Sequence, residues 1–307
     1  ALLLGHYNAR PVFHAFARER IGYFIAAIAL YLASQVMSAW RWQLLARVNS
    51  IPGPFREYLA YYFVGVFTNL FVPGLVGGDA ARALYLGRRH NRLADAIASV
   101  IADRGIGLLA LFWFAAGCAL LLRTVSLPPS VLRVTVTIGA AALAGWLASP
   151  LLARLATRIG GRFASVTGPF LPYLHRPVAI IPAIILSLIL QASLAVCQYL
   201  LARGLGLETS LATFMLCVPI ANVFASLPIT LNGLGVREAA YLVLFGHAGL
   251  SKPDTIALGL LWFASTTIGG LSGIFAFVTT RLPAASEDPE SASEPTIEAA
   301  AGTNISG

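Results

Sequence analysis

The sequence predicts an all-α polytopic membrane protein, and three observations lead to that class. Of its 307 residues, 58% are apolar and 11% are charged, against roughly 45–50% and about 25% in soluble domains. Apolar runs that are nearly free of charge recur at 21–40, 105–122, 131–149, 177–202 and 255–280. At 1.5 Å per residue, each run can cross a hydrocarbon core of roughly 30 Å. Finally, stretches of the first half return in the same order in the second half.

The two ends of the chain differ from this apolar body. The sequence opens with ALLLG rather than a methionine, which resembles the last turn of a helix, so a further spanning helix is expected upstream. Residues 282–307 are small, acidic and proline-bearing, and they contain no aromatic side chain. Such a composition cannot bury a core. We therefore expect a transmembrane domain over 1–281 and a disordered acidic tail over 282–307.

Positive charge dominates the predicted transmembrane domain. The net charge is +8, from 21 Lys and Arg against 13 Asp and Glu, and five of those acids lie in the tail. A basic membrane body suits an anionic lipid or a phosphate-bearing substrate. The alternative is ordinary anchoring of cytoplasmic loops by arginine.

Three pairs of segments carry the internal similarity. They are LLARVNSIPGPF (44–55) with LLARGLGLETSL (200–211), FTNLFVPGLVGGDAAR (67–82) with FASLPITLNGLGVREAA (224–240), and ADAIA (94–98) with PDTIA (253–257). The pairs are collinear, at offsets of 156 to 159 residues. This order predicts two related repeats, one over about 20–149 and the other over about 177–281.

The topology depends on how residues 55–92 meet the membrane. Three arginines (Arg41, Arg47, Arg56) precede this segment or open it, and four (Arg82, Arg88, Arg89, Arg92) close it. A segment that dips in and returns places all seven on one side, giving twelve cytoplasmic cations against eight outside, as the positive-inside bias favours. The two repeats are then inverted, with interrupted, re-entrant helices that meet near the midplane, a recurring plan of transporters. A full crossing by 55–73 is the alternative.

The first helix break lies at NLFVPGLVGGDAAR (69–82). Pro73 and the glycines at 74, 77 and 78 are expected to end one helix and free backbone groups, which a membrane tolerates only against protein or a wet cavity. Asp79 is a natural N-cap of the next helix, whose N–H groups favour anions. Asn69, Gly78, Asp79 and Arg82 are therefore candidate headgroup ligands. A surface turn with a capped helix is the alternative.

The second half has a similar break at LNGLGVREAA (231–240), where Asn232, Gly233 and Gly235 precede Arg237 and Glu238. An acid and a base thus recur at both breaks. If both breaks reach the midplane, Asn232, Arg237 and Glu238 face the same polar cavity as the residues of the first break.

Asp103 and Arg104 lie about eleven residues into a predicted helix that starts near Arg92, hence roughly 15 Å deep. Ionisable groups at such depth usually face a protein interior or an aqueous path. The two side chains point about 100° apart, so they cannot simply neutralise each other. Asp103 shares its face with Ser99 and Gly107. The alternative to headgroup binding is a structural ion pair of Asp103 with Arg82 or Arg237, and the two roles can coexist.

Other features of the sequence point away from catalysis. The histidines lack metal-ligand spacing, the cysteines form no CxxC, and no GxxxxGK[ST], GxSxG, HExxH or GxGxxG motif is present. We therefore expect no metal, no cofactor and no enzymatic activity. The segment AWRWQLL (39–45) is interpreted as an interfacial anchor.

Four motifs together resemble the flippase-like membrane domain of lysylphosphatidylglycerol synthases, over about 20–280. They are RW near a helix end, Y..G.F.NLF.PG..GGD..R, SV..DR..GL and LPI...G.G.RE. The resemblance implies a multi-pass inner-membrane protein that handles lipids. It implies functional positions at Asn69, Asp79, Arg82, Asp103, Arg104, Arg237 and Glu238. The synthases append a soluble aminoacyltransferase domain, whereas an acidic tail follows here, so synthase activity is not expected.

Together these features predict a bacterial inner-membrane lipid translocator with a cavity between two repeats. Arg82, Arg104 and Arg237 would hold a phosphate, because guanidinium matches its oxygens. Asp79, Asp103 and Glu238 would position those arginines or bind a headgroup amine. The partners would be membrane lipids, with no nucleic acid. The alternative is a non-transporting, lipid-binding partner of a lipid synthase or glycosyltransferase.

Overall fold

The computed structural model describes residues 20–72, 76–122, 127–159, 168–225 and 236–283, and within them every regular element is a helix. The α-helices are α2 (Ile21–Val48), α3 (Phe55–Phe71), α4 (Val76–His90), α5 (Leu93–Leu121), α6 (Pro129–Ile159), α8 (Leu171–His175), α9 (Ile181–Gly204), α10 (Leu211–Ala225), α11 (Val236–His247), α12 (Lys252–Leu271) and α13 (Gly273–Thr279). Two 3₁₀ turns, η3 (Gly168–Phe170) and η4 (Pro177–Ile180), flank α8. The all-α class is confirmed. The predicted tail lies almost entirely outside the described residues.

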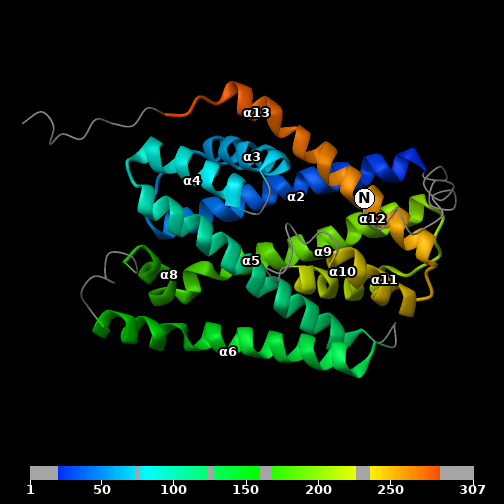
Figure 1. Cartoon of the computed structure of the whole chain (residues 1–307). Coiled ribbons are helices and arrows are strands. Elements are labelled where there is room, and N and C mark those ends of the chain that lie inside the picture. The colour runs from blue at the N-terminus through cyan, green and yellow to red at the C-terminus, as the bar shows by residue number, and fades with distance from the viewer. Residues whose placement is uncertain (1–19, 73–75, 123–126, 160–167, 226–235, 284–307) are drawn as a thin grey trace, which may run out of the picture.

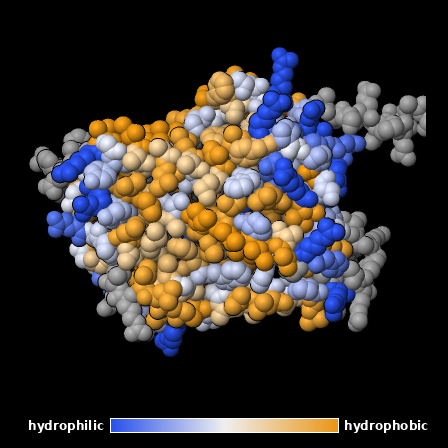
Figure 2. All heavy atoms as spheres, turned by 180° about the vertical axis from the view of Figure 1, so that it is seen from behind, coloured by the Kyte–Doolittle hydropathy of each residue, from blue (hydrophilic) through white to orange (hydrophobic). Residues whose placement is uncertain are grey.

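Each apolar run of the sequence lies, to within one residue at its ends, inside a helical span that is long and apolar enough to cross a membrane. These candidate spans are Ile21–Val48, Leu93–Leu121, Pro129–Leu151, Val178–Gly204 and Lys252–Thr279. Figure 2 shows a broad apolar region over one face, with hydrophilic residues gathered mainly toward its ends. Because these side chains need an apolar solvent, the protein is a multi-pass membrane protein, as predicted.

The central helices α2 and α9 pack along each other in opposite directions (Figure 1). At one end, the amide of Arg20 donates to the carbonyl of Gly204 at 3.1 Å. At the other end, the Asn49 amide donates to the carbonyl of Pro169, just before α9, at 3.0 Å. The segments that follow α2 and α9 therefore start from opposite ends of the molecule.

Helices α3 and α4 form a hairpin that enters and leaves at the end where α2 finishes. Near its open end, Glu57 and His90 lie 3.2 Å apart, and the rings of Tyr61 and Tyr85 lie 5.3 Å apart. A Cβ on Gly78 would collide with the carbonyl oxygen of Gly65, so glycine permits this close approach. The start of α3 and the end of α4 lie at one end of the molecule, as the arginine distribution favours, whereas a re-entrant path in the membrane stays a prediction. The hairpin's position on the cytoplasmic side also stays a prediction.

Helices α10 and α11 form a second hairpin, which starts where α9 finishes. Phe214 near its start packs on Phe245 near its end, with ring centroids 5.0 Å apart. The helix starts follow the sequence offsets, because α3 and α10 begin at 55 and 211, and α5 and α12 at 93 and 252. The hairpins thus enter from opposite ends, whereas descent from an inverted duplication stays a prediction.

Each hairpin packs against the long helix of the other half. Helix α3 lies on α12 and α13, where a Cβ on Gly273 would meet the carbonyl of Phe63, and α10 lies on α5. Helix α6 connects the two halves and lies at one edge of the molecule (Figure 1), where Trp146 meets Trp113 of α5 at 5.6 Å. In the first half, α5 contacts both α2 and α4, and these three helices enclose one buried cluster of charges.

Candidate functional site

Asp103 lies at the centre of that cluster and is 1% exposed. Its Oδ1 accepts from Nε of Arg41 on α2 at 2.8 Å, and its Oδ2 accepts from Nη1 of Arg82 on α4 at 3.0 Å. The structural ion pair between Asp103 and Arg82 is thereby confirmed. Arg237, the other partner considered, is not among the residues that Asp103 contacts in the described part of the chain.

Arg82 continues the cluster toward Asp79. Its Nη2 lies 3.0 Å from Asp79 Oδ1, and the side chain is 3% exposed. Its guanidinium carbon also lies 5.0 Å from the centre of the Trp42 ring and 5.3 Å from that of Tyr62. Two carboxylates and two ring faces therefore surround Arg82, which fixes its orientation.

Arg104 ends the cluster at an accessible position. Its Nε and Nη2 donate to the two oxygens of Asp79 at 2.7 and 3.0 Å, a two-point contact of the strong charge-assisted kind. The Arg104 side chain is 43% exposed, whereas that of Asp79 is 18% exposed. The result is an ionic chain that runs Arg41–Asp103–Arg82–Asp79–Arg104. It is buried at Arg41 and exposed at Arg104.

Three members of the ionic chain (Arg41, Asp103 and Arg104) lie well inside the apolar spans of α2 and α5. Arg41 is seven residues before the end of α2 and Asp103 is ten residues after the start of α5, which places them roughly 10 and 15 Å from that end. Unpaired charges at this depth are strongly unfavourable. Each carboxylate here contacts two arginines, so both negative charges are paired.

Neutral side chains complete the hydrogen bonding around the buried end. Ser187 of α9 accepts from Nη1 of Arg41 at 2.9 Å, and the Trp42 indole donates to Ser99 at 3.1 Å. The Arg41 guanidinium packs beside Gly107, where a Cβ would lie 3.4 Å from Nη1. Ser99 and Gly107 do share the face of Asp103, as the helical spacing predicts.

The first break differs from the prediction in one respect. Helix α4 begins at Val76, so Asp79 lies in its first turn and is not the N-cap. Asn69 of α3 reaches across the hairpin instead, and its Oδ1 accepts from the amide of Gly78 at 2.8 Å. That amide, predicted to be available to an anion, is therefore already satisfied.

The second break is described only in part. Arg237 and Glu238 form an ion pair at 3.4 Å, with side chains 21% and 28% exposed. Asn232 lies outside the described residues, as do 73–75 and 226–235, the tips of both breaks. The shared cavity between the breaks therefore stays a prediction.

Sequence reasoning missed Arg41 and Trp42. Their interpretation as an interfacial anchor is wrong, because both are buried in the ionic chain and its aromatic wall, whereas Trp40 is exposed. Arg41 and Arg82 accordingly do not belong among the twelve cytoplasmic cations. The available signal was the apolar continuation of α2 to Val48, which moves Arg41 away from the helix end.

Comparison with known proteins places this chain in a family. The chain matches the family model described as the lysylphosphatidylglycerol synthase TM region over residues 1–273. It belongs to the lysylphosphatidylglycerol synthase transmembrane family. A UPF0104 membrane protein of Pyrococcus horikoshii is 29% identical over 90 residues, which cover 28% of this chain and 27% of that protein. The chain thus matches about a quarter of the length of this curated relative, and no solved structure matches it.

Three of the four motifs that carry the resemblance to this family meet at one place in the structure. RW, GGD..R and DR supply all five members of the ionic chain, from three different helices. No group of three potential metal ligands occurs in the part of the chain that the structure describes.

Proposed function

We propose that this member of the lysylphosphatidylglycerol synthase transmembrane family moves lipid headgroups through the membrane domain, with Arg104 as the contact for the headgroup phosphate. The observation that supports this most is the position of Arg104. Arg104 lies on the apolar span Leu93–Leu121 and is the most exposed member of the ionic chain, at 43%. Charged groups at such depth are costly and commonly mark the path of a substrate.

The charge balance of the ionic chain favours an anion. It contains three arginines and two aspartates, so one positive charge is left over in a region of low dielectric. A phosphodiester headgroup carries one negative charge and would neutralise the excess. Its oxygens also match the two-point geometry of guanidinium. Arg82 is unsuited to this contact in the described conformation, because it is buried between two carboxylates.

Exchange at Asp79 supplies a mechanism for capture and release. A headgroup phosphate would replace Asp79 on Arg104, while Arg82 continues to hold Asp79 through its own ion pair. The freed oxygen of Asp79 could then accept from an amine on the headgroup. Arg237 and Glu238 would offer a similar pair of groups in the second half.

We further propose that the protein acts in the bacterial inner membrane, on anionic or other polar phospholipids, without enzymatic activity and without a cofactor. Transport would be downhill or coupled to an ion. A lipid-synthesising enzyme is a possible partner, because the matched family model describes only the transmembrane region.

One observation favours a second function. The buried part of the ionic chain is closed, with Arg82 and Asp103 almost fully inaccessible, so the site could hold a headgroup without passing it on. The protein would then be a lipid-binding partner of a synthase or glycosyltransferase.

A scrambling assay in proteoliposomes separates the two functions. The purified full chain is reconstituted with fluorescent analogues of phosphatidylglycerol, phosphatidylethanolamine and phosphatidylcholine, and inner-leaflet label is quenched as it reaches the outer leaflet. A translocator speeds quenching of at least one headgroup over protein-free vesicles. Unchanged rates for every headgroup, together with saturable lipid binding, would favour the binding partner.

A further inference from the structure

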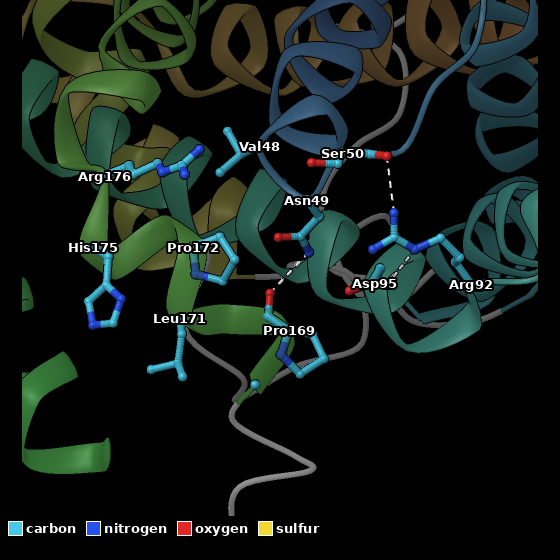
Figure 3. Close-up of a pocket in the computed structure, with 11 residues that line it drawn as sticks. Val48, Asn49, Ser50, Arg92, Asp95, Pro169, Leu171, Pro172, His175 and Arg176 are labelled. Carbon is cyan, nitrogen blue, oxygen red and sulfur yellow. Dashed lines mark hydrogen bonds and ion pairs between the residues drawn. The ribbon is translucent and has the colours of Figure 1, made fainter. Parts of the chain in front are cut away.

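A cavity of ≈ 630 Å³ opens where α2 ends and where α5 and α9 begin (Figure 3). Its lining comes from three places that are far apart in the sequence. These are the end of α2 and the turn after it (Val48, Asn49, Ser50), the start of α5 (Arg92, Asp95) and the segment that leads into α9 (Gly168, Pro169, Leu171, Pro172, His175, Arg176).

This cavity is separate from the ionic chain. Asn49 lies eight residues beyond Arg41, and Asp95 lies eight residues before Asp103, so the two sites are roughly 12 Å apart along both helices. The buried hydrogen bond between Trp42 and Ser99 lies at an intermediate level. The cavity is therefore a second site, at the end of the spans rather than within them.

Asn49 contributes an acceptor that lacks a donor. The side chain is 5% exposed, and its Nδ2 donates to the carbonyl of Pro169 at 3.0 Å. Its Oδ1 has no hydrogen-bond partner among the described residues. In Figure 3 this oxygen points away from Pro169, toward the side of the cavity that holds Pro172 and Arg176. Buried amide oxygens are seldom left unpaired, which indicates a ligand or water that supplies a donor there.

The cavity also has an excess of positive charge. Arg92 donates from Nε to Asp95 at 2.9 Å and from Nη1 to the carbonyl of Ser50 at 3.0 Å. Arg176 lines the opposite side, and its side chain forms no ion pair or hydrogen bond within the described residues. Two arginines thus face one carboxylate, and Arg176 is available to an anion.

We propose that this cavity binds a phosphate group that carries a neighbouring hydroxyl or ammonium donor. Arg176, with support from Arg92, would hold the phosphate, and Asn49 Oδ1 would accept from the donor. A phospholipid headgroup has this chemistry, and so does a small phosphorylated polyol. Basic pockets between the ends of transmembrane helices are known headgroup sites. The inference goes beyond the proposed function, because binding here requires no translocation.

Binding of two probes tests the proposal on the full chain in maltoside micelles, which contain no phosphate. Glycerol 3-phosphate represents the soluble source and short-chain phosphatidylglycerol the lipid source, and each is titrated by calorimetry. We expect saturable binding of at least one probe. Arg176→Gln should weaken it about tenfold or more, because a charged hydrogen-bonding partner is lost. Arg88→Gln, an exposed arginine at the same end but outside the cavity, is the matched control and should change nothing.

The outcomes are distinct. Binding of both probes assigns the phosphate and its donor as sufficient, and binding of the lipid alone assigns the headgroup within a bilayer lipid. No saturable binding of either probe, or equal weakening by Arg176→Gln and Arg88→Gln, would overturn the proposal. An effect of Arg104→Ala on transport with unchanged binding here would separate this site from the proposed path.

Asn49 is tested by the choice of ligand. Methyl phosphate lacks the hydroxyl groups of glycerol 3-phosphate, so the wild-type protein should bind it several-fold more weakly. In Asn49→Leu, checked for folding by its melting temperature, this preference should disappear. Equal affinity of the wild-type protein for the two phosphates would remove Asn49 from the site.

Discussion

The two halves of the molecule solve the same packing problem in different ways. At the offset of 156 residues Trp42 corresponds to Gln198, and in the match of 67–82 with 224–240 Arg82 falls opposite Ala240, the residue before Tyr241. Within each half, the side chains at or next to these positions touch each other. The Arg82 guanidinium lies 5.0 Å from the Trp42 ring, and the Tyr241 hydroxyl donates to the Gln198 side chain at 2.7 Å.

The difference extends to the centre of the ionic chain. Asp103 corresponds to Trp262 and Ser187 to Tyr31. Asp103 of the first half and Ser187 of the second half both contact Arg41. At the corresponding positions, Trp262 of the second half and Tyr31 of the first half meet edge to face at 5.9 Å. One half is ionic where the other is aromatic and neutral.

This comparison indicates why the charges matter. Neutral contacts are sufficient to pack the corresponding helices in the second half, so the fold does not require ions at these positions. Buried ion pairs are often no more stable than well-packed apolar residues of similar volume. Charges that the packing does not need, placed deep in an apolar span, point to function.

The largest predicted difference between the halves is the face of the membrane at which each hairpin has its open end. Single cysteines that replace Arg56 and Arg89, near the open end of the first hairpin, should react with an impermeant maleimide from one face of the membrane, the cytoplasmic one. Cysteines that replace Glu208 and Lys252, beside the second hairpin, should react only from the other face. Labelling of all four from one face would contradict the opposed hairpins.

The next largest effect is expected when one partner of the ionic chain is removed. Asp103→Asn leaves Arg41 and Arg82 buried without their shared carboxylate, which should cost about 3–5 kcal/mol of stability. Thermal melting in detergent measures this loss, with Arg88→Gln as a surface control. A melting temperature equal to that of the wild type would mean that the buried pairs do not hold the helices.

Replacing the whole buried part by apolar residues should restore stability. In the triple variant Arg41→Met, Arg82→Met and Asp103→Leu, Asp79 and Arg104 remain as a balanced pair. Because the Tyr241–Gln198 and Tyr31–Trp262 contacts are neutral, this variant should melt above Asp103→Asn and close to the wild type. A triple variant that melts as low as Asp103→Asn would show that the first half depends on its charges for packing.

A smaller effect is expected in the neutral half. Tyr241→Phe removes the hydroxyl that donates to Gln198 and leaves a buried amide oxygen unpaired, at a cost of about 1–3 kcal/mol. The melting temperature should fall less than for Asp103→Asn. A larger fall than for Asp103→Asn would reverse the ranking of the two halves.

Periodicity and charge predicted much of this fold. Apolar runs identified the five spans, and the arginines on both sides of 55–92 indicated the hairpin that Glu57 and His90 now close. The depth of Asp103, with its separation from Arg104 around the helix, predicted a partner on another helix, and Arg82 is such a partner.

The missed features depend on contacts between helices. Arg41 followed by Trp42 has the composition of an interfacial anchor, and only the packing of α2 on α5 and α9 shows that it faces Asp103 and Ser187. Asn69 likewise meets Gly78 only because the hairpin brings them together. A single sequence states neither which face of an apolar helix is buried nor what it meets.

The central claim is that Arg104 holds a lipid phosphate, and scrambling by Arg104 variants tests it most directly. Without Arg104 the ionic chain retains two arginines and two aspartates, so Arg104→Ala should fold and melt normally. Arg104→Lys keeps the charge but loses the two-point geometry. The measurement is headgroup scrambling in proteoliposomes, with Arg88→Ala as control. We predict that both Arg104 variants are folded and lose transport while Arg88→Ala retains it. Full transport by Arg104→Ala would contradict the claim.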